Sequence, residues 1–329
     1  MADVLRFRRV YGGEYEEIPA RVDDAEFPAG ELLTARTVWL EDGTPSGLEL
    51  IQHRPVHGDR RQQGYLRLDN EILAGRRLHQ AASWSGYPAE VVRLYGDEST
   101  SADPFALFEL DHGDPLREVG EYLLNDAFDQ FLVGLLTGLC WLAGAGIAHR
   151  AISPDTVLWD SDTGKVRIAD FSRSAPFGSA RTPVAGSWAW VPREARPETC
   201  YGLVGPTDDM WAAARLIYFV RSRGKDLEDK GKLGELGLSQ MFNGLLEKIL
   251  GPPEDRPTAR DLVEHGLRRH HILPSLQDDG DKRLIQGRTS FLKTRARVHP
   301  DAPLPPDFWD DVIWARDRRG AGGPQGGAG

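Results

Sequence analysis

The sequence contains one long stretch without a charged side chain, from Phe131 to Ala148, and this stretch limits the folds open to the chain. Its 18 residues reach the lower length limit for a helix that spans a membrane. Four glycines interrupt it, however, and its large apolar side chains recur at intervals of three and four residues, as on one buried face of a helix. We therefore predict a core helix that ends near Ala143, and no membrane contact.

The order of the other expected elements indicates an α+β fold. The pattern predicts an antiparallel hairpin of strands 32–40 and 47–56, followed by two more strands at 90–98 and 104–110. The expected helices are 65–80, 115–124, 126–143, 208–222, 238–250 and 258–266. A small antiparallel sheet with one helix, followed by a larger helical part, is typical of a two-lobed fold with a ligand-binding cleft.

This order predicts three regions. Residues 1–112 are expected to form a β-rich lobe, and residues 113–273 a mainly helical lobe. Residues 274–329 are expected to form a C-terminal extension. Its Gly-rich end lacks apolar side chains, so we expect that end to be disordered.

Charge and cysteine content exclude several classes of protein. The chain has 50 acidic and 40 basic side chains, so its net charge of −10 lacks the positive field that a nucleic-acid-binding protein needs. Its two cysteines are too few for a disulfide framework or a four-thiolate zinc site. The first twenty residues contain charges throughout and no apolar core of a signal peptide. We expect a cytoplasmic protein.

Residues 147–171 carry the most specific pattern in the chain. His-Arg-Ala at 149–151, Pro154 and Asp-Phe-Ser at 170–172 are separated by two short strand patterns and a turn. This segment resembles the catalytic and metal-binding loops of eukaryotic-type (Hanks-type) Ser/Thr protein kinases, which have His-Arg-Asp and Asp-Phe-Gly at these places. The resemblance implies the bilobal fold of that family.

Three more matches extend the resemblance over about residues 30–270. It places Glu194 at the end of the activation segment, Asp209 at the start of the long buried helix, and Arg256 in a late segment of the large lobe. It also implies that Arg256 pairs with Glu194, and that Arg150 ties the activation segment to the core. These roles concern the fold and not the chemistry.

The parts that grip a triphosphate are missing from the expected small lobe. Phosphoryl transfer needs a lysine on the phosphates and a glycine-rich loop over them. The first lysine of the chain is Lys165, and the hairpin register places His53 at the lysine position, or Gln52 if it is shifted by one. The expected loop, 31–38, contains no glycine.

The catalytic loop is altered as well. The resemblance places Ala151 where the family has the proton-accepting aspartate, and a methyl group cannot accept a proton. It places Thr156 at the asparagine that binds the second magnesium ion, and Ser153 at the lysine between them. The chain therefore resembles a degenerate kinase, with no catalytic residue in place.

A few groups that bind nucleotide in the family remain. Asp170 is at the first metal carboxylate and Glu71 at the glutamate that pairs with the missing lysine. The backbone of Glu109 and Asp111 can still meet an adenine ring, although a bulky Phe108 narrows the pocket behind it. A lone carboxylate is a poor magnesium site. We predict that no cofactor is required, with ATP and magnesium binding as the open alternative.

One segment of the extension stands apart. Residues 303–314 combine a proline run with three large apolar side chains beside acids. Such a segment either packs on the chain's own large lobe or docks on a partner protein. We favour the first.

Together these patterns predict a bacterial-type pseudokinase that acts as a scaffold or allosteric partner of another protein. One alternative is an unconventional phosphotransferase or nucleotidyl transferase that uses Asp155 or Asp160 as its base. Another is a nucleotide-sensing module without turnover, which a shift in melting temperature with ATP would reveal.

Overall fold

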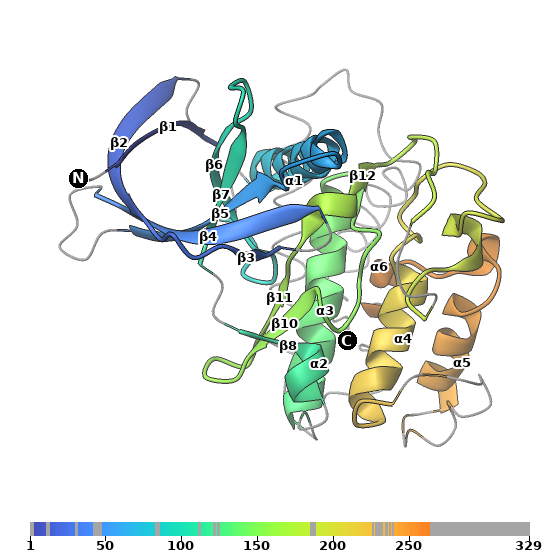
Figure 1. Cartoon of the computed structure of the whole chain (residues 1–329). Coiled ribbons are helices and arrows are strands. Elements are labelled where there is room, and N and C mark those ends of the chain that lie inside the picture. Colours follow the sequence, from blue (N-terminus) through green and yellow to red (C-terminus); the bar gives the residue numbers. More distant parts are fainter. Residues whose placement is uncertain are drawn as a thin grey trace, which may run out of the picture.

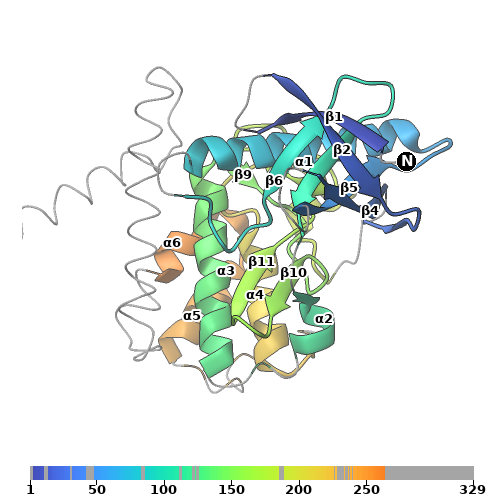
Figure 2. The same ribbon diagram turned by 90° about the vertical axis from the view of Figure 1, so that its left-hand side faces the viewer.

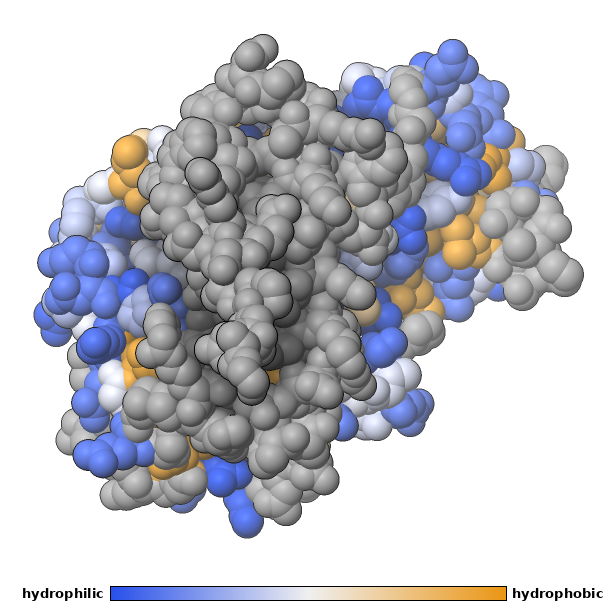
Figure 3. Space-filling view, turned by 180° about the vertical axis from the view of Figure 1, so that it is seen from behind, coloured by the Kyte–Doolittle hydropathy of each residue, from blue (hydrophilic) through white to orange (hydrophobic). Residues whose placement is uncertain are grey.

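A computed structural model describes residues 3–263, apart from short gaps. The gaps are 11–13, 30–31, 42–47, 83–85, 111–112, 121–122, 124–125, 185–188, 226, 228–232, 234–235, 237 and 239. A sheet with one long helix lies at one side of the molecule, and a group of helices lies at the other (Figures 1 and 2). The described surface of the sheet part, seen from behind, is mostly hydrophilic with small separate hydrophobic patches (Figure 3).

Seven antiparallel strands form the main sheet. They are β1 (Asp3–Arg9), β2 (Tyr15–Val22), β3 (Phe27–Pro28), β4 (Leu33–Leu40), β5 (Leu48–Pro55), β6 (Leu94–Glu98) and β7 (Phe105–Glu109). Their order is β2-β1-β6-β7-β5-β4-β3, and β2 also pairs with β4, so six strands close into a ring (Figure 1). The predicted hairpin is confirmed as β4 and β5, with Leu33 opposite Pro55 and Leu40 opposite Leu48.

The N-terminal hairpin of β1 and β2 closes this ring. Its side chains alternate: Leu5 and Phe7 pack into the ring's core, whereas Arg6 and Arg8 stack on the ring of Tyr15. The core inside the ring consists of Phe7, Ala20, Val38, Leu40, Leu50, Phe105 and Leu107. The ring thus has an apolar core of its own, separate from that of the helices.

Close packing of β1 on β6 requires a glycine at position 96. Gly96 is opposite Arg9, and a Cβ on it would lie 2.7 Å from the Phe7 ring and 2.8 Å from the Arg8 carbonyl oxygen. We expect Gly96→Ala to lower the free energy of unfolding by about 1–3 kcal/mol, because the backbone of β1 must move. Denaturant titration measures this loss. The control is Gly205→Ala, where nothing lies within 4 Å of the added Cβ, and equal losses in both variants would contradict the explanation.

The long helix α1 (Arg61–Ala82) packs on the outer face of the sheet. It begins four residues before the predicted 65–80, after Gly58, whose φ of 89° lets the Arg61 amide donate to the Gly58 carbonyl. Its core-facing side chains Leu68 and Ile72 pack with apolar residues of β4, β6 and β7. Arg76 adds an ion pair to the buried Asp97 of β6, at 2.6 Å. These contacts fix α1 against the strands that carry the candidate site.

The other part of the molecule is built around α3 (Asp126–Gly144), the predicted core helix. Its large side chains are buried: Phe128, Phe131, Leu132, Leu135, Leu136, Leu139 and Leu142. Among the described residues, the window Ala127–Gly144 is long and apolar enough to cross a membrane, but 56% of it is buried inside the molecule. The prediction of a buried helix is confirmed.

The remaining helices surround α3. They are α2 (Leu116–Val119), α4 (Met210–Arg221), α5 (Gln240–Ile249) and α6 (Ala259–Asp261). Two of them, α2 and α6, are shorter than the predicted 115–124 and 258–266, and residues after 263 lie outside the described part. A capping box between Thr258 and Asp261 starts α6.

Short strands connect the two parts. A three-stranded sheet has the order β11 (Lys165–Ile168), β10 (Val157–Asp160) and β8 (Asp114–Pro115). Two further strands, β9 (Ile147–Ala148) and β12 (Ala175–Pro176), pair with each other. The predicted strand pair with a turn at 161–164 is therefore present, and it places the segment 170–172 next to α1.

Candidate functional site

The site begins with a contact between β5 and α1. His53, near the end of β5, has its Nδ1 atom 2.8 Å from Oε2 of Glu71 on α1. The His53 ring also contacts the ring of Phe108 on β7, with 4.8 Å between centroids. The neighbouring Gln52 side chain points to the opposite face of β5. There its Oε1 accepts a hydrogen bond from Arg36 at 2.6 Å. Of the two residues considered for the lysine position, His53 is the one that contacts Glu71.

Burial and the charge of Glu71 shift the pKa of His53 in opposite directions. Burial lowers the pKa of the imidazole, but the attraction and hydrogen bond of Glu71 outweigh it, so the pKa of His53 lies above 6.5. Burial raises the pKa of Glu71 above 4.5, although His53 opposes this shift. Both groups hold their protons more strongly in the folded chain than in the unfolded one.

The pair therefore gives the fold a pH dependence. Groups with raised pKa values stabilise the fold at low pH, and the His53 contribution is lost as the pH rises from 6.5 through its raised pKa. We expect the wild-type melting temperature to fall, relative to that of the variant His53→Asn/Glu71→Gln, as the pH rises above 6.5 and through the raised pKa of His53. Differential scanning fluorimetry across this range measures the difference. A constant difference would contradict a titrating pair.

Asp170 lies near this pair and is held in a specific conformation. Its backbone is left-handed, with φ 59° and ψ 74°, and its carboxylate accepts a hydrogen bond from the Ser172 amide at 3.2 Å. Asn70 of α1 donates to the Ser172 carbonyl at 2.9 Å, which fixes this segment to the helix. No cluster of three or more metal-ligating side chains occurs among the residues that the structure describes. Asp170 therefore belongs to no such cluster within the described part of the chain.

The loop 149–156 is shaped by a buried carboxylate. Asp209, just before α4, accepts hydrogen bonds from the amides of His149 at 2.7 Å and Arg150 at 2.6 Å. The His149 ring is fully buried, bonds the Ala169 carbonyl and packs edge-on against Phe171. These hydrogen bonds hold the loop 149–156 against the start of α4, which is the scaffold role predicted for Asp209.

The polar side chains of that loop are used to hold the loop itself. The Thr156 hydroxyl donates to the Ala151 carbonyl at 2.7 Å and lies 3.3 Å from the Ser153 hydroxyl. Thr156 is buried, with 8% of its surface exposed. Its oxygen is therefore engaged with the loop backbone, while Ala151 presents only a methyl group. The four positions predicted to have lost their function, 53, 151, 153 and 156, lie on β5 and this loop.

Three arginines order the segment that follows. Arg150 donates to both the hydroxyl and the carbonyl of Thr182. Arg181 forms two hydrogen bonds with the Asp208 carboxylate, at 2.8 and 3.0 Å, and binds two backbone carbonyls. Arg256 and Glu194 form the predicted buried pair, and each side chain is 3% exposed. The pair of Arg181 and Asp208 was not predicted, because an arginine in a loop gives no periodic signal.

Comparisons with known proteins agree with this arrangement. The chain is 28% identical over 224 residues to sperm motility kinase Z of Mus musculus, 61% of this chain and 42% of the relative. It is 28% identical over 179 residues to the serine/threonine-protein kinase PknL of Mycobacterium tuberculosis, 52% of this chain and 44% of that protein. It is 25% identical over 187 residues to the serine/threonine-protein kinase DCLK2 of Rattus norvegicus, 55% of this chain and 23% of that protein. The fold is protein-kinase-like.

The likeness covers only part of each protein. The chain spans less than half the length of these curated relatives, and no family model matches it. The predicted Ser/Thr-kinase resemblance and α+β class are therefore supported at the level of a kinase-like fold.

One expectation about this kinase-like site is wrong in position. The phosphate-covering loop was expected at 31–38, but β4 already occupies 33–40 and pairs with β5 along its whole length. The Leu33 side chain is buried against α1, and the Leu32 carbonyl lies 2.8 Å from a Cβ built on Gly64. Leu33 and the Leu32 carbonyl therefore lie against α1, where a phosphate-covering loop was expected.

The other predicted site residues are the two hinge residues and the two alternative bases. Glu109 ends β7, its amide donates to the Arg93 carbonyl, and its carboxylate pairs with Arg93 at 2.8 Å. Asp111 lies outside the described residues. Both alternative bases, Asp155 and Asp160, have other partners. The Asp155 carboxylate pairs with Arg117 on the surface, and the Asp160 carboxylate accepts a hydrogen bond from Thr163 within its own turn.

Proposed function

We propose that this kinase-like chain is a pseudokinase, with lobes formed by residues 1–112 and 113–273, that does not transfer phosphate. The observation that carries the proposal is the pair of His53 and Glu71. A lysine at position 53 would be long enough to bind both Glu71 and a phosphate. The shorter His53 side chain, hydrogen-bonded to Glu71, does not extend that far. Ala151 removes the general base as well, which by itself costs a factor of about 10² to 10⁴.

The same proposal assigns the chain a role in binding another protein in the cytoplasm. Arg150 and Arg181 fix the segment around Thr182 without any added phosphate group. Tyr201 and Leu203, next to this segment, are 58% and 62% exposed. A rigid surface with exposed large apolar side chains suits recognition, since little entropy is lost when a partner binds.

Incubation with labelled ATP, magnesium or manganese, and a generic protein acceptor tests the proposal. We expect no product above background, and no difference between wild type and Asp170→Ala. A signal on the acceptor or on the chain itself that is lost in Asp170→Ala would overturn it.

Thermal unfolding with and without ATP distinguishes the remaining readings. No shift supports a binding protein that needs no nucleotide. A shift without product would favour the nucleotide-sensing reading, and a shift with product would favour an unconventional transferase.

A further inference from the structure

A pocket of about 490 Å³ lies apart from the candidate site, at the turn between β10 and β11. β10 leads away from the loop 149–156, and β11 returns toward Asp170. Each strand has four residues, so the turn is about 13 Å from the site end of the hairpin. The volume is within the usual range for pockets that bind a small ligand or a few side chains.

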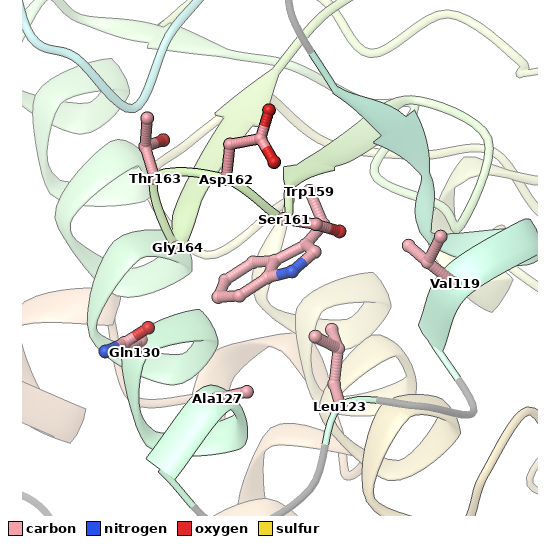
Figure 4. A pocket seen from close by; sticks show the side chains of 9 residues that line it. All are labelled: Val119, Leu123, Ala127, Gln130, Trp159, Ser161, Asp162, Thr163 and Gly164. Carbon is pink, nitrogen blue, oxygen red and sulfur yellow. The ribbon is translucent and has the colours of Figure 1, made fainter.

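The pocket has an apolar floor and a polar rim. Its lining residues are Val119, Leu123, Ala127, Gln130, Trp159, Ser161, Asp162, Thr163 and Gly164. The Trp159 indole lies between the turn residues on one side and Leu123 and Ala127 on the other (Figure 4). Trp159 and Leu123 are each 4% exposed. The part of the floor that remains exposed is therefore small, and it consists of aromatic and aliphatic atoms.

The rim is rigid and carries one charge. Asp160, below it, accepts hydrogen bonds from the amides of Asp162 and Thr163 at 3.0 and 3.1 Å, and from the Thr163 hydroxyl at 2.6 Å. Asp162 is exposed, and its carboxylate makes no hydrogen bond or ion pair with any residue in the described part of the chain. It is the only charged residue among those lining the pocket. An occupant should thus combine an apolar side chain with a cation.

We propose that the chain's own segment 288–297 occupies this pocket, with Phe291 and Leu292 on the Trp159 floor and a neighbouring cation on Asp162. The segment lies outside the described residues. Residues 282–298 contain no acidic side chain, although the whole chain has a net charge of −10. Their basic residues are Lys282, Arg283, Arg288, Lys293, Arg295 and Arg297.

Net charge distinguishes segment 288–297 from the other candidate occupant in the same extension, segment 303–314. Residues 303–314 also offer apolar anchors, but they contain Asp307, Asp310 and Asp311 and no basic residue. Asp162 would repel them. This assignment differs from the expectation that 303–314 packs on the large lobe, and the two segments can be tested against each other.

The chain between the last described residue and the segment 288–297 is long enough to reach the pocket. Val263 is the last described residue, and 24 residues separate it from Arg288. Fully extended, they span up to roughly 80 Å. The last described helix, α6, packs on α3, whose first turns supply Ala127 and Gln130 to the pocket. Because α3 has 19 residues and is therefore about 28 Å long, the pocket is well within reach.

Site-specific photocross-linking of the full-length chain tests the proposal. A benzophenone amino acid replaces Phe291 in one protein and Phe308 in another, and mass spectrometry locates the cross-linked peptides. We expect the probe at 291 to react within residues 119–130 or 159–164 of the same molecule, at a yield independent of protein concentration. Asp162→Lys should lower this yield at least tenfold.

The control has the same change of charge at a distant exposed position on α1, Asp69→Lys, and should leave the yield unchanged. Because the Asp162 side chain is not bonded within the turn, both variants should keep the wild-type melting temperature. Pocket cross-links from position 308 alone, none from position 291, or a yield that disappears on dilution would each overturn the proposal, the last by assigning the pocket to a second copy. The proposal does not rest on the absence of phosphotransfer.

Discussion

Arg256→Ala is expected to destabilise the fold by about 3–5 kcal/mol, the usual cost of removing one partner of a buried ion pair. Both oxygens of Glu194 contact the Arg256 guanidinium, which also donates to the Gly251 carbonyl at 3.1 and 3.2 Å. Without the guanidinium, the Glu194 carboxylate stays buried and loses its ion-pair partner, although the Arg181 charge still attracts it. Equilibrium unfolding in denaturant measures the loss.

Two further variants separate charge from packing. Arg193→Ala, at an exposed position one residue before Glu194, removes a similar side chain and should change stability by less than about 0.5 kcal/mol. The double variant Arg256→Met/Glu194→Leu should recover much of the loss, because no unpaired charge remains. A loss below about 1 kcal/mol in Arg256→Ala would show that the pair contributes little.

Asp209→Leu should cost about 2–6 kcal/mol, since two buried amides, those of His149 and Arg150, would lose their acceptor and each such loss costs about 1–3 kcal/mol. The loop 149–156 should loosen at the same time. We therefore expect faster hydrogen exchange at these two amides in addition to the lower free energy of unfolding.

Asp155→Asn is the matched control for that variant. Asp155 is in the same loop, but its side chain is 55% exposed in an ion pair with Arg117, so the change should cost less than about 1 kcal/mol. If Asp209→Leu left amide exchange at 149 and 150 unchanged, the carboxylate would not be what holds the loop.

The parts of the site that depend on local spacing were predictable from the sequence. The expected hairpin register gave two choices for the lysine position, and one of them, His53, contacts Glu71. The contacts of Asp209 with the loop 149–156 and of Arg256 with Glu194 followed from the resemblance.

The missed features depend on contacts between distant segments. Leu5 and Phe7 alternate with Arg6 and Arg8, which is a strand signal, but no local pattern shows that β1 joins β6 or that β2 joins β4. Arg181 and Asp208 are likewise 27 residues apart, in segments without periodicity. The expected loop at 31–38 overlapped the predicted strand 32–40, and the structure has strand β4 at 33–40.

Closure of the ring by the N-terminal hairpin has a consequence for recognition. A strand at the rim of an open sheet exposes unpaired amides and carbonyls, to which a foreign peptide can add as an extra strand. Here β1 and β2 already occupy those groups along parts of β6 and β4. Backbone-to-backbone capture is therefore blocked where the hairpin pairs, which also protects the chain from aggregation there. A protein that met the chain at these paired stretches would have to recognise side chains instead of backbone groups.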